Sequence, residues 1–260
     1  MAEVIESFLR TEYKYRMNHA KAEEFMKRAS DHIVPDIYPQ YTVYNIYCDS
    51  EDNRMALRCL EHPDYKEKLR FRSYVDPDEN TPVFMEVKKK FDGLTGKRRI
   101  VLNEASAMAY LNDHVRPGID SQIARELDFF METYRPVAKV SAFYDRRCYA
   151  SISEQDVRVT FDENIRYRTE NVSIHEDGTE IPLIDDPDTV MLEIKADRRC
   201  PLWLTEIISD MKLRRTSFSK YTSIYEKQLR ETIGNKRRTP AFEAAYAAGK
   251  KEMKSCLIQY

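Results

Sequence analysis

Charged side chains recur at every second position in several short stretches of this 260-residue sequence. In the stretch 83–90, Glu86, Lys88 and Lys90 alternate with Met85 and Val87. Because a β-strand has a side-chain period of two, such a stretch places its charges on one face and its apolar residues on the other. Taken alone, this pattern is typical of a strand whose charged face meets water.

The same alternation recurs elsewhere in the chain, which changes that interpretation. The other stretches carry Glu12, Lys14 and Arg16; Arg70 and Arg72; Lys97 and Arg99; Arg158, Thr160 and Asp162; and Glu193 and Lys195. An economical way to combine them is a barrel turned inside out, with charged faces lining a central tunnel and apolar faces packing outward against helices. Closure also removes the exposed sheet edges. We therefore predict an α+β fold built on a closed antiparallel β-barrel with a charged interior, surrounded by helices.

Such a tunnel would contain more bases than acids. Unpaired charges held together and away from water are strongly disfavoured, so an anion must balance them. A triphosphate or polyphosphate chain has the required charge, and arginine offers it a planar fork while lysine offers a point charge. The candidate phosphate-binding bases are Lys14, Arg70, Arg72, Lys88, Lys97, Arg146 and Arg158, with Lys90 and Arg99 extending the same basic faces.

Carboxylates on the same faces point to a metal ion. A carboxylate repels a phosphate ligand unless a divalent cation lies between them, and Mg²⁺ and Mn²⁺ bridge these groups through oxygen ligands. Glu193 is the best metal candidate, although a plain ion pair with Lys195 is the alternative. For Glu12 and Glu86, a salt bridge to a tunnel base explains the residue type as well as metal binding does.

Two further motifs combine hydroxyl and basic groups. Tyr144 and Arg146 share one strand face, where both would meet a phosphate; the alternative is an aromatic barrel residue beside a surface arginine. Ser219 precedes a predicted helix. It either caps that helix or, together with Lys220, forms an anion site at the positive helix end.

Composition narrows the functional class. The net charge is −2, from 42 Lys and Arg against 44 Asp and Glu, whereas a nucleic-acid binder is usually basic. The five cysteines form no C-x-x-C pair, which disfavours zinc and disulfide frameworks and fits a reduced cytosol. We see neither a secretory leader nor an apolar run near the ~20 residues of a membrane span, so we expect a cytoplasmic protein. Glycine-rich phosphate loops are also absent from the sequence.

Periodicity and turn residues predict the elements that carry these motifs. We expect strands over about 8–17, 41–49, 67–75, 83–91, 97–102, 137–151, 156–168 and 190–195. Asn18 caps a helix that runs to about His32, where the segment 35–39 with its two prolines breaks it. Further helices are expected over about 54–60, 103–112, 120–133, 201–211 and 219–229. One domain is expected over 1–235, followed by a helical tail over 236–260.

Eight motifs in this order resemble the VTC domain, the polyphosphate polymerase module of the vacuolar transporter chaperone complex, in its stand-alone bacterial form. That family belongs to the triphosphate tunnel metalloenzymes, which share an eight-stranded tunnel barrel with CYTH-type triphosphatases. The resemblance covers roughly residues 8–230. The motifs are Glu12-Tyr-Lys-Tyr, Arg70-Phe-Arg, Phe84-Met-Glu-Val-Lys, Lys97-Arg-Arg, Tyr144-Asp-Arg, Arg158-Val-Thr-Phe-Asp, Leu192-Glu-Ile-Lys and Phe218-Ser-Lys-Tyr.

The resemblance implies ATP-driven synthesis of polyphosphate with Mn²⁺ or Mg²⁺ in the tunnel. Pyrophosphate or polyphosphate would be the other ligand, and a membrane protein is a candidate partner. Tyr144 and Ser219 would donate hydrogen bonds and Glu193 would hold the metal. Phosphates would be bound by Lys14, Arg70, Arg72, Lys88, Lys97, Arg146, Arg158 and Lys220, with Arg98 or Arg99 as alternatives to Lys97.

One position departs from the family pattern. Eukaryotic members tend to have a base two residues before the serine of Ser-Lys-Tyr, and Ser217 stands there in this chain. The departure weakens the expectation of full polymerase activity, or requires another base in its place. Two other readings therefore stay open. A tunnel with water as the acceptor would be a triphosphatase, and a tunnel without turnover would be a polyphosphate sensor or carrier.

Overall fold

The computed structural model describes residues 11–61, 64–76, 78, 81–91, 94–196 and 200–235. Two compact units divide the chain, Met1–Thr222 and Ser223–Tyr260. The elements are β1 (Thr11–Asn18), α1 (His19–Ala29), β2 (Ile33–Asp49), α2 (Arg54–Leu60), β3 (Tyr65–Ser73), β4 (Pro82–Phe91), β5 (Leu94–Asn103), α3 (Glu104–Asp113), α4 (Gln122–Tyr134), β6 (Val137–Ser151), β7 (Arg158–Arg168), β8 (Ile181–Pro182), β9 (Thr189–Ala196), α5 (Leu202–Asp210) and α6 (Lys220–Asn235).

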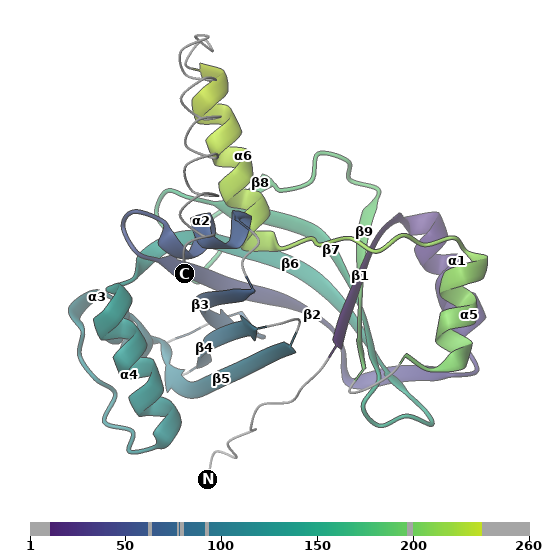
Figure 1. The fold of residues 1–260 in the computed structure, drawn as a ribbon, viewed down its shortest axis with the longest axis horizontal. Helices are drawn as coiled ribbons and strands as arrows, with labels where there is room; N and C mark the ends of the chain where they lie inside the picture. The colour runs from purple at the N-terminus through teal and green to yellow at the C-terminus, as the bar shows by residue number, and fades with distance from the viewer. Residues whose placement is uncertain are drawn as a thin grey trace, which may run out of the picture. The chain divides into compact units, whose positions relative to one another are not determined.

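The strands form one antiparallel sheet in the order β1-β9-β7-β6-β2-β3-β4-β5, with β8 paired to β7. Figure 1 shows this sheet strongly curved, so that β1 and β9 stand steeply to β3, β4 and β5. No hydrogen-bonded ladder joins β1 to β5 among the described residues, so the predicted closed barrel is not confirmed. What the structure shows is an α+β fold with a large, curved antiparallel sheet.

A hydrogen-bonded ladder between β1 and β5 would close the barrel, and other contacts of β1 are found instead. The backbone N–H of Thr216 donates to the carbonyl of Lys14 at 2.8 Å, and Tyr15 forms an isolated bridge with Arg215. The segment before α6 therefore uses backbone groups at the outer edge of β1. The two ends of the sheet also meet through side chains, because Lys88 of β4 contacts both carboxylate oxygens of Glu12 on β1 at 2.8 Å.

The apolar faces of the strands point outward, as the alternation predicts. One buried cluster consists of residues from β2, β3, β4 and β5 packed against α2, α3 and α4. It includes Leu69, Phe71, Met85 and Leu127. A second cluster joins β1, β7 and β9 with α1 and α5, and includes Phe25. Figure 1 shows the α3–α4 pair and the α1–α5 pair on different outer sides of the sheet. Both cores thus lie behind the strands, and the charged side chains lie on the opposite face of the sheet.

Local sequence explains the helix boundaries. The side chains of Asn18, Asn103 and Ser121 accept backbone hydrogen bonds at the starts of α1, α3 and α4, at 2.8 to 3.0 Å. His114 and Arg135 end α3 and α4 in the left-handed conformation that commonly terminates helices. No described helix has the length and apolar character needed to cross a membrane.

The segment with the two prolines differs from the prediction. It does not follow a helix that runs to His32, because α1 ends at Ala29 and β2 already begins at Ile33. The pairing of β2 with β6 is irregular between Pro35 and Gln40, and a bulged register tolerates a residue without a backbone N–H. The strand β8 was also not predicted. The predicted strand residues 8–10 and the predicted tail 236–260 lie outside the described residues.

Candidate phosphate-binding site

Strand register arranges charged side chains, most of them predicted site residues, in rows across the inner face of β3, β4 and β5. One row consists of Lys68, Lys88 and Lys97, and the next of Arg70, Glu86 and Arg99. Residues opposite one another in a sheet have Cβ atoms about 4.5–5.5 Å apart. The fold therefore concentrates positive charge from three strands, although each strand alone shows only an alternating pattern.

Glu86 lies at the centre of the second row, where its side chain is only 1% exposed. Arg70 contacts one carboxylate oxygen at 2.7 Å and Lys97 contacts the other at 2.9 Å. Burial would raise the pKa of Glu86, but Arg70, Arg72 and Lys97 hold it well below its ordinary value. Both oxygens are thus engaged by bases, which fits the salt-bridge alternative for Glu86 and leaves it poorly placed to bind a metal.

Arg72 is nearly buried, at 5% exposure, and its hydrogen-bond partners are neutral. It donates to Asn45 Oδ1 at 2.8 Å and to the Tyr144 hydroxyl at 2.9 Å. Burial would raise the pKa of Tyr74, yet nearby Arg72 lowers it to about 8. A buried guanidinium held only by neutral groups is suited to an anionic ligand.

The inner face of β3, β4 and β5 forms one wall of the candidate site. The opposite wall is formed by β1, β9, β7 and β6. Asp162 on β7 binds Arg146 through two contacts of 2.6 and 2.9 Å, and Lys220 contacts the same carboxylate at 2.5 Å. Burial would raise the pKa of Asp162, but Arg146 and Lys220 lower it to about 2. Lys220 also lies 3.8 Å from the centre of the Tyr144 ring. Tyr144 therefore touches the bases of both walls.

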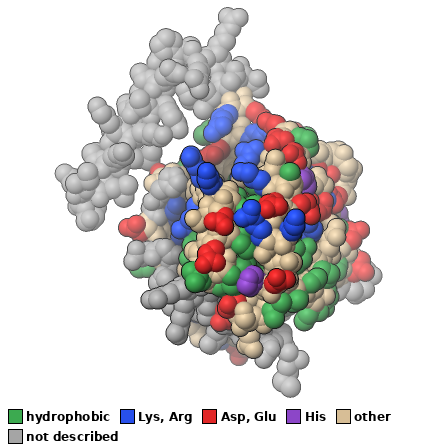
Figure 2. All heavy atoms as spheres, turned by 90° about the vertical axis from the view of Figure 1, so that its right-hand side faces the viewer, with side chains coloured by type: hydrophobic (Ala, Val, Ile, Leu, Met, Phe, Trp, Pro, Cys, Tyr) green, Lys and Arg blue, Asp and Glu red, His purple; other side chains and the backbone are tan. Residues whose placement is uncertain are grey.

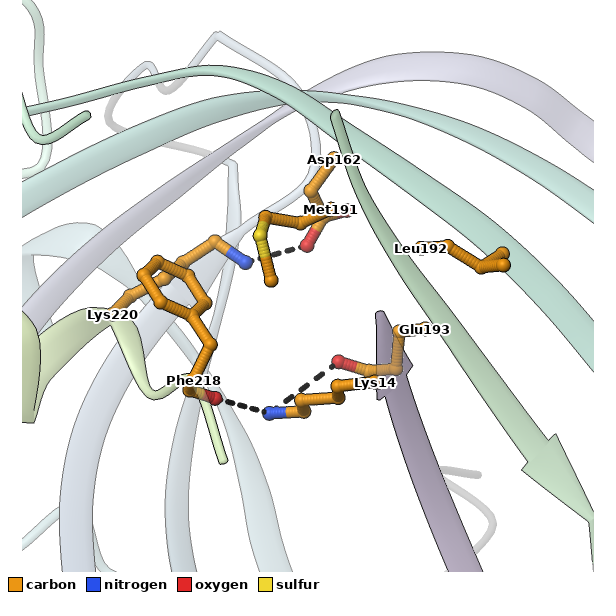
Figure 3. Close-up of a pocket in the computed structure, with 7 residues that line it drawn as sticks. All are labelled: Lys14, Asp162, Met191, Leu192, Glu193, Phe218 and Lys220. Atoms are coloured by element: carbon orange, nitrogen blue, oxygen red, sulfur yellow. Dashed lines mark hydrogen bonds and ion pairs between the residues drawn. The ribbon is translucent and has the colours of Figure 1, made fainter. Parts of the chain in front are cut away.

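Glu193 lies in a pocket on this wall (Figure 3), lined by Lys14, Asp162, Met191, Leu192, Glu193, Phe218 and Lys220. One of its oxygens is 2.9 Å from Lys195, and the other is 3.8 Å from Lys14. Burial would raise the pKa of Glu193, but Lys195 and Lys14 hold it well below its ordinary value. Lys14 also donates to the carbonyl of Phe218 at 3.0 Å.

The donor chemistry fits a divalent cation that shares its ligands with phosphate. Among the described residues, no three Asp, Glu, His or Cys side chains gather around one point. Mg²⁺ commonly needs only one or two carboxylates when phosphate oxygens complete its shell. Both carboxylate oxygens of Glu12 accept a hydrogen bond from Lys88 at 2.8 Å. One carboxylate oxygen of Glu193, by contrast, has only the 3.8 Å contact with Lys14. Of these two carboxylates, Glu193 thus has the oxygen that is less engaged by a base.

Some predicted residues lie away from this centre. Arg158, the first residue of β7, is 54% exposed and pairs with Asp36 at 3.3 Å. Lys90 is exposed, and Arg99 stacks 4.9 Å from the Phe84 ring. Ser219 accepts a hydrogen bond from Lys68 at 2.6 Å, while its contact with the backbone of Thr222, the capping geometry, is long at 3.5 Å.

Sequence reasoning assigned no role to several residues that the fold places in the site. Lys68, Asp162 and Lys195 have the same strand periodicity as predicted residues, so alternation alone was a sufficient signal for them. Asn45 and Tyr74, by contrast, carry no charge pattern and enter through their contacts with Arg72. Figure 2 views the side of the molecule that lies on the right in Figure 1. Lys and Arg side chains gather on the upper part of this side, with Asp and Glu side chains beside them.

The start of α6 is anchored by a buried carboxylate. Asp49 accepts hydrogen bonds from the backbone of Met55 and Ala56 and, at 2.7 Å, from the hydroxyl of Tyr221. The Tyr221 ring also stacks on Tyr47 with 5.2 Å between centroids. These contacts fix the residue next to Lys220 and thereby position the lysine that binds Asp162.

We expect Tyr221→Phe to lower the free energy of unfolding by about 1–2 kcal/mol, because Asp49 loses a buried donor. Chemical denaturation of the full chain measures this loss. Tyr38→Phe is the matched control, since Tyr38 is 75% exposed and a surface change of this kind costs about 0.5 kcal/mol or less. Equal stability of the two variants would show that the Tyr221 hydroxyl does not anchor α6.

Comparison with solved structures shows the same fold in two distant proteins. A candidate adenylate cyclase from Bacillus halodurans is 10% identical, with a TM-score of 0.53 over 83% of this chain and 96% of that one. A candidate adenylyl cyclase from Hippeastrum, in which triphosphatase activity is dominant, is 12% identical, with a TM-score of 0.51 over 86% of this chain and 96% of that one. At such identities the likeness concerns the fold alone.

No curated protein matches the sequence closely. A family model does match, however, and over most of the chain: the model of the VTC domain aligns with residues 9–228. This range contains all the strands of the curved sheet and every residue of the candidate site. The chain therefore belongs to the VTC domain family, as the order of its motifs indicated.

Proposed function

We propose that this protein is a metal-dependent polyphosphate polymerase, which transfers the γ-phosphate of ATP to the end of a growing inorganic polyphosphate chain. Membership of the VTC domain family supports the proposal. The observation that carries it is Arg72, a nearly buried arginine whose hydrogen-bond partners are neutral. A polyphosphate supplies the anionic oxygens that this guanidinium lacks.

The charge balance of the inner face agrees with a polyanionic ligand. Glu12, Glu86, Asp162 and Glu193 are outnumbered by the bases around them. Those bases are Lys14, Lys68, Arg70, Arg72, Lys88, Lys97, Arg146, Lys195 and Lys220. A phosphate chain would replace ion pairs between side chains with charge-assisted contacts to its own oxygens.

For phosphoryl transfer, a protein must chiefly position the reacting groups and stabilise the charge of the transition state. In this proposal Arg70, Arg72 and Lys97 hold the nucleotide phosphates on one wall, and Arg146 and Lys220 hold the acceptor end on the other. Glu193 would hold Mn²⁺ or Mg²⁺, which supplies neutralising charge to the phosphates when bound. Asp162 would hold Arg146 and Lys220 in place through its ion pairs with them.

A ³¹P NMR time course with ATP and Mn²⁺, with and without short polyphosphate, tests the proposal. We expect the resonance of internal phosphates to grow as ADP forms, and to grow faster with the added primer. Orthophosphate as the sole phosphate product besides ADP would identify a triphosphatase. Tight binding of triphosphate without turnover would identify a sensor.

The triphosphatase is the second candidate, because the Hippeastrum protein of the same fold has that dominant activity. The two reactions differ only in the acceptor, which is water in one case and a phosphate oxygen in the other. An enzyme that hydrolyses the triphosphate must admit water to the γ-phosphate, whereas a polymerase must exclude it. Release of orthophosphate in the presence of excess primer therefore measures which acceptor the site favours.

We expect the affinity for tripolyphosphate to fall as the pH rises through about 8. Burial lowers the pKa of Lys88 to about 8, with Glu12 opposing this shift, and the pKa of Tyr74 is also about 8. Above this pH the ammonium loses its positive charge and the phenol gains a negative one, so both changes disfavour an anion. Calorimetric titration between pH 7 and 9.5 measures the loss, which we expect to reach about tenfold.

A Lys88→Arg variant provides the control, because arginine stays charged throughout this range. The ratio of wild-type to variant affinity cancels the titration of the ligand itself. This ratio should fall with rising pH. A constant ratio would mean that the charge of Lys88 does not change between pH 7 and 9.5.

A further inference from the structure

Lys68 is the one member of the lysine row that lacks a carboxylate contact within the described parts of the chain. Lys88 binds Glu12 at 2.8 Å and Lys97 binds Glu86 at 2.9 Å. Lys68, in register with Lys88, instead donates to two hydroxyl oxygens. These belong to Ser219 at 2.6 Å and Thr222 at 3.1 Å.

Among the described residues, no carboxylate balances the charge of Lys68. Like charges directly opposite one another on neighbouring strands are destabilising. A partly buried ammonium with only hydroxyl partners gains hydrogen bonds but no counter-charge. Its position beside the start of α6 adds to the cost, because the positive end of a helix dipole favours an anion and disfavours a cation. An anion at this point would relieve all three effects.

We propose that Lys68, Ser219 and Thr222 form a phosphate subsite, which binds one phosphate of the polyanionic substrate at the start of α6. This inference rests on the proposed function, because it assigns a further contact to the same ligand. In this subsite Lys68 supplies positive charge to the phosphate, and Thr222 supplies a hydroxyl group that contacts it. An ammonium has three N–H groups, of which two are used here, so the third is available to a phosphate oxygen.

The hydroxyl groups suit the same ligand. The Thr222 hydroxyl donates to Ser219 at 3.1 Å, and both oxygens accept from Lys68. A hydroxyl group rotates about its C–O bond, so it can accept from the ammonium while it donates to an anion. The three side chains thus bring polar groups from one strand and from the start of a helix within 3.1 Å of one another.

Calorimetry of the full chain with sodium tripolyphosphate tests this subsite through substitutions that separate charge from hydrogen bonding. Lys68→Gln keeps a donor for the hydroxyl groups but removes the charge, and we expect it to weaken binding roughly ten- to a hundredfold. Lys68→Arg keeps the charge and should bind within about threefold of the wild type. Thr222→Val should weaken binding severalfold.

Lys89→Gln is the matched control. Lys89 lies on the neighbouring strand β4 and pairs with Glu67 at 3.8 Å, so its substitution should leave the affinity unchanged. Wild-type affinity in Lys68→Gln would overturn the subsite. Equal losses in Lys68→Gln and Lys68→Arg, with a lowered melting temperature in both, would also overturn it, since Lys68 would then act as a structural anchor.

The same experiments distinguish the subsite from the function on which it rests. Binding of tripolyphosphate that depends on the charge of Lys68, without chain growth in the NMR assay, would overturn the polymerase and support the subsite. Chain growth with Lys68→Gln binding as the wild type does would overturn the subsite alone. Failure of the wild type to bind tripolyphosphate would overturn both.

Discussion

Glu193→Gln should abolish turnover while the fold and the binding of triphosphate persist. Glutamine keeps the shape of the side chain but removes the negative charge that a divalent cation requires. We expect the rate of ADP formation to fall by at least about a hundredfold, the scale of losing a group that stabilises transition-state charge. Measurement of ATP consumption with saturating Mn²⁺, together with calorimetry of tripolyphosphate, separates the rate from the affinity.

The structure also defines what a different result would mean. Glu193 contacts Lys195 at 2.9 Å and Lys14 at 3.8 Å, so its carboxylate already has a role in balancing charge. If Glu193→Gln turned over ATP at a near-normal rate, charge balance would be its whole role. Glu163→Gln is the control, because Glu163 lies on β7 and pairs with Arg147 at 2.6 Å instead of lining the pocket. It should retain wild-type turnover.

Alternation predicted the inward and outward faces of the strands because burial depends only on side-chain period. Leu69, Phe71 and Met85 are completely buried against the helices, and Arg70 and Glu86 lie on the opposite face, as expected. Most elements were predicted to within a few residues for the same reason, but β2 begins at Ile33 and not at 41, α6 ends at Asn235 and not at about 229, and β8 was not predicted. The exception at the segment 35–39 arose because a bulge lets proline stay within a paired strand.

The partners of the charged residues were not predictable, because they depend on register and curvature. Glu12 and Lys88 are 76 residues apart and meet only because the sheet bends. Asp162 lies in the middle of β7 between Arg146 and Lys220, whereas Arg158 is the first residue of the strand and is largely exposed. The same alternating stretch thus contains a central residue and a peripheral one, and the pattern does not distinguish them.

Register also explains why the sequence pattern did not identify Lys68 as a site residue. The conspicuous motif on β3 is Arg70-Phe-Arg, and Lys68 adds one more base to it. Its significance comes from the carboxylates that Lys88 and Lys97 have and that Lys68 lacks among the described residues. The resemblance led us to expect a base at the position of Ser217, as in eukaryotic members, and Ser217 is exposed here. Lys68, 2.6 Å from Ser219, is a further base that the fold brings to this part of the chain, beside Lys14.

Arg70→Ala should nearly eliminate triphosphate binding, but the single variant confounds two effects. Arg70 contacts Glu86 at 2.7 Å, and that carboxylate is 1% exposed. Removing one partner of a buried ion pair costs about 3–5 kcal/mol, because the other charge stays buried without compensation. Part of any loss of binding would therefore reflect a damaged fold, or a free Glu86 that repels the phosphates.

The double variant Arg70→Ala/Glu86→Gln separates these effects. It removes both charges of the pair, so we expect the free energy of unfolding to recover relative to Arg70→Ala, as judged by chemical denaturation. Calorimetry with a non-hydrolysable ATP analogue should still show binding weakened by more than about tenfold, because the phosphate has lost its guanidinium fork. Recovery of affinity along with stability would mean that Arg70 serves the fold by neutralising Glu86, and that Arg72 alone provides the arginine contact on this wall.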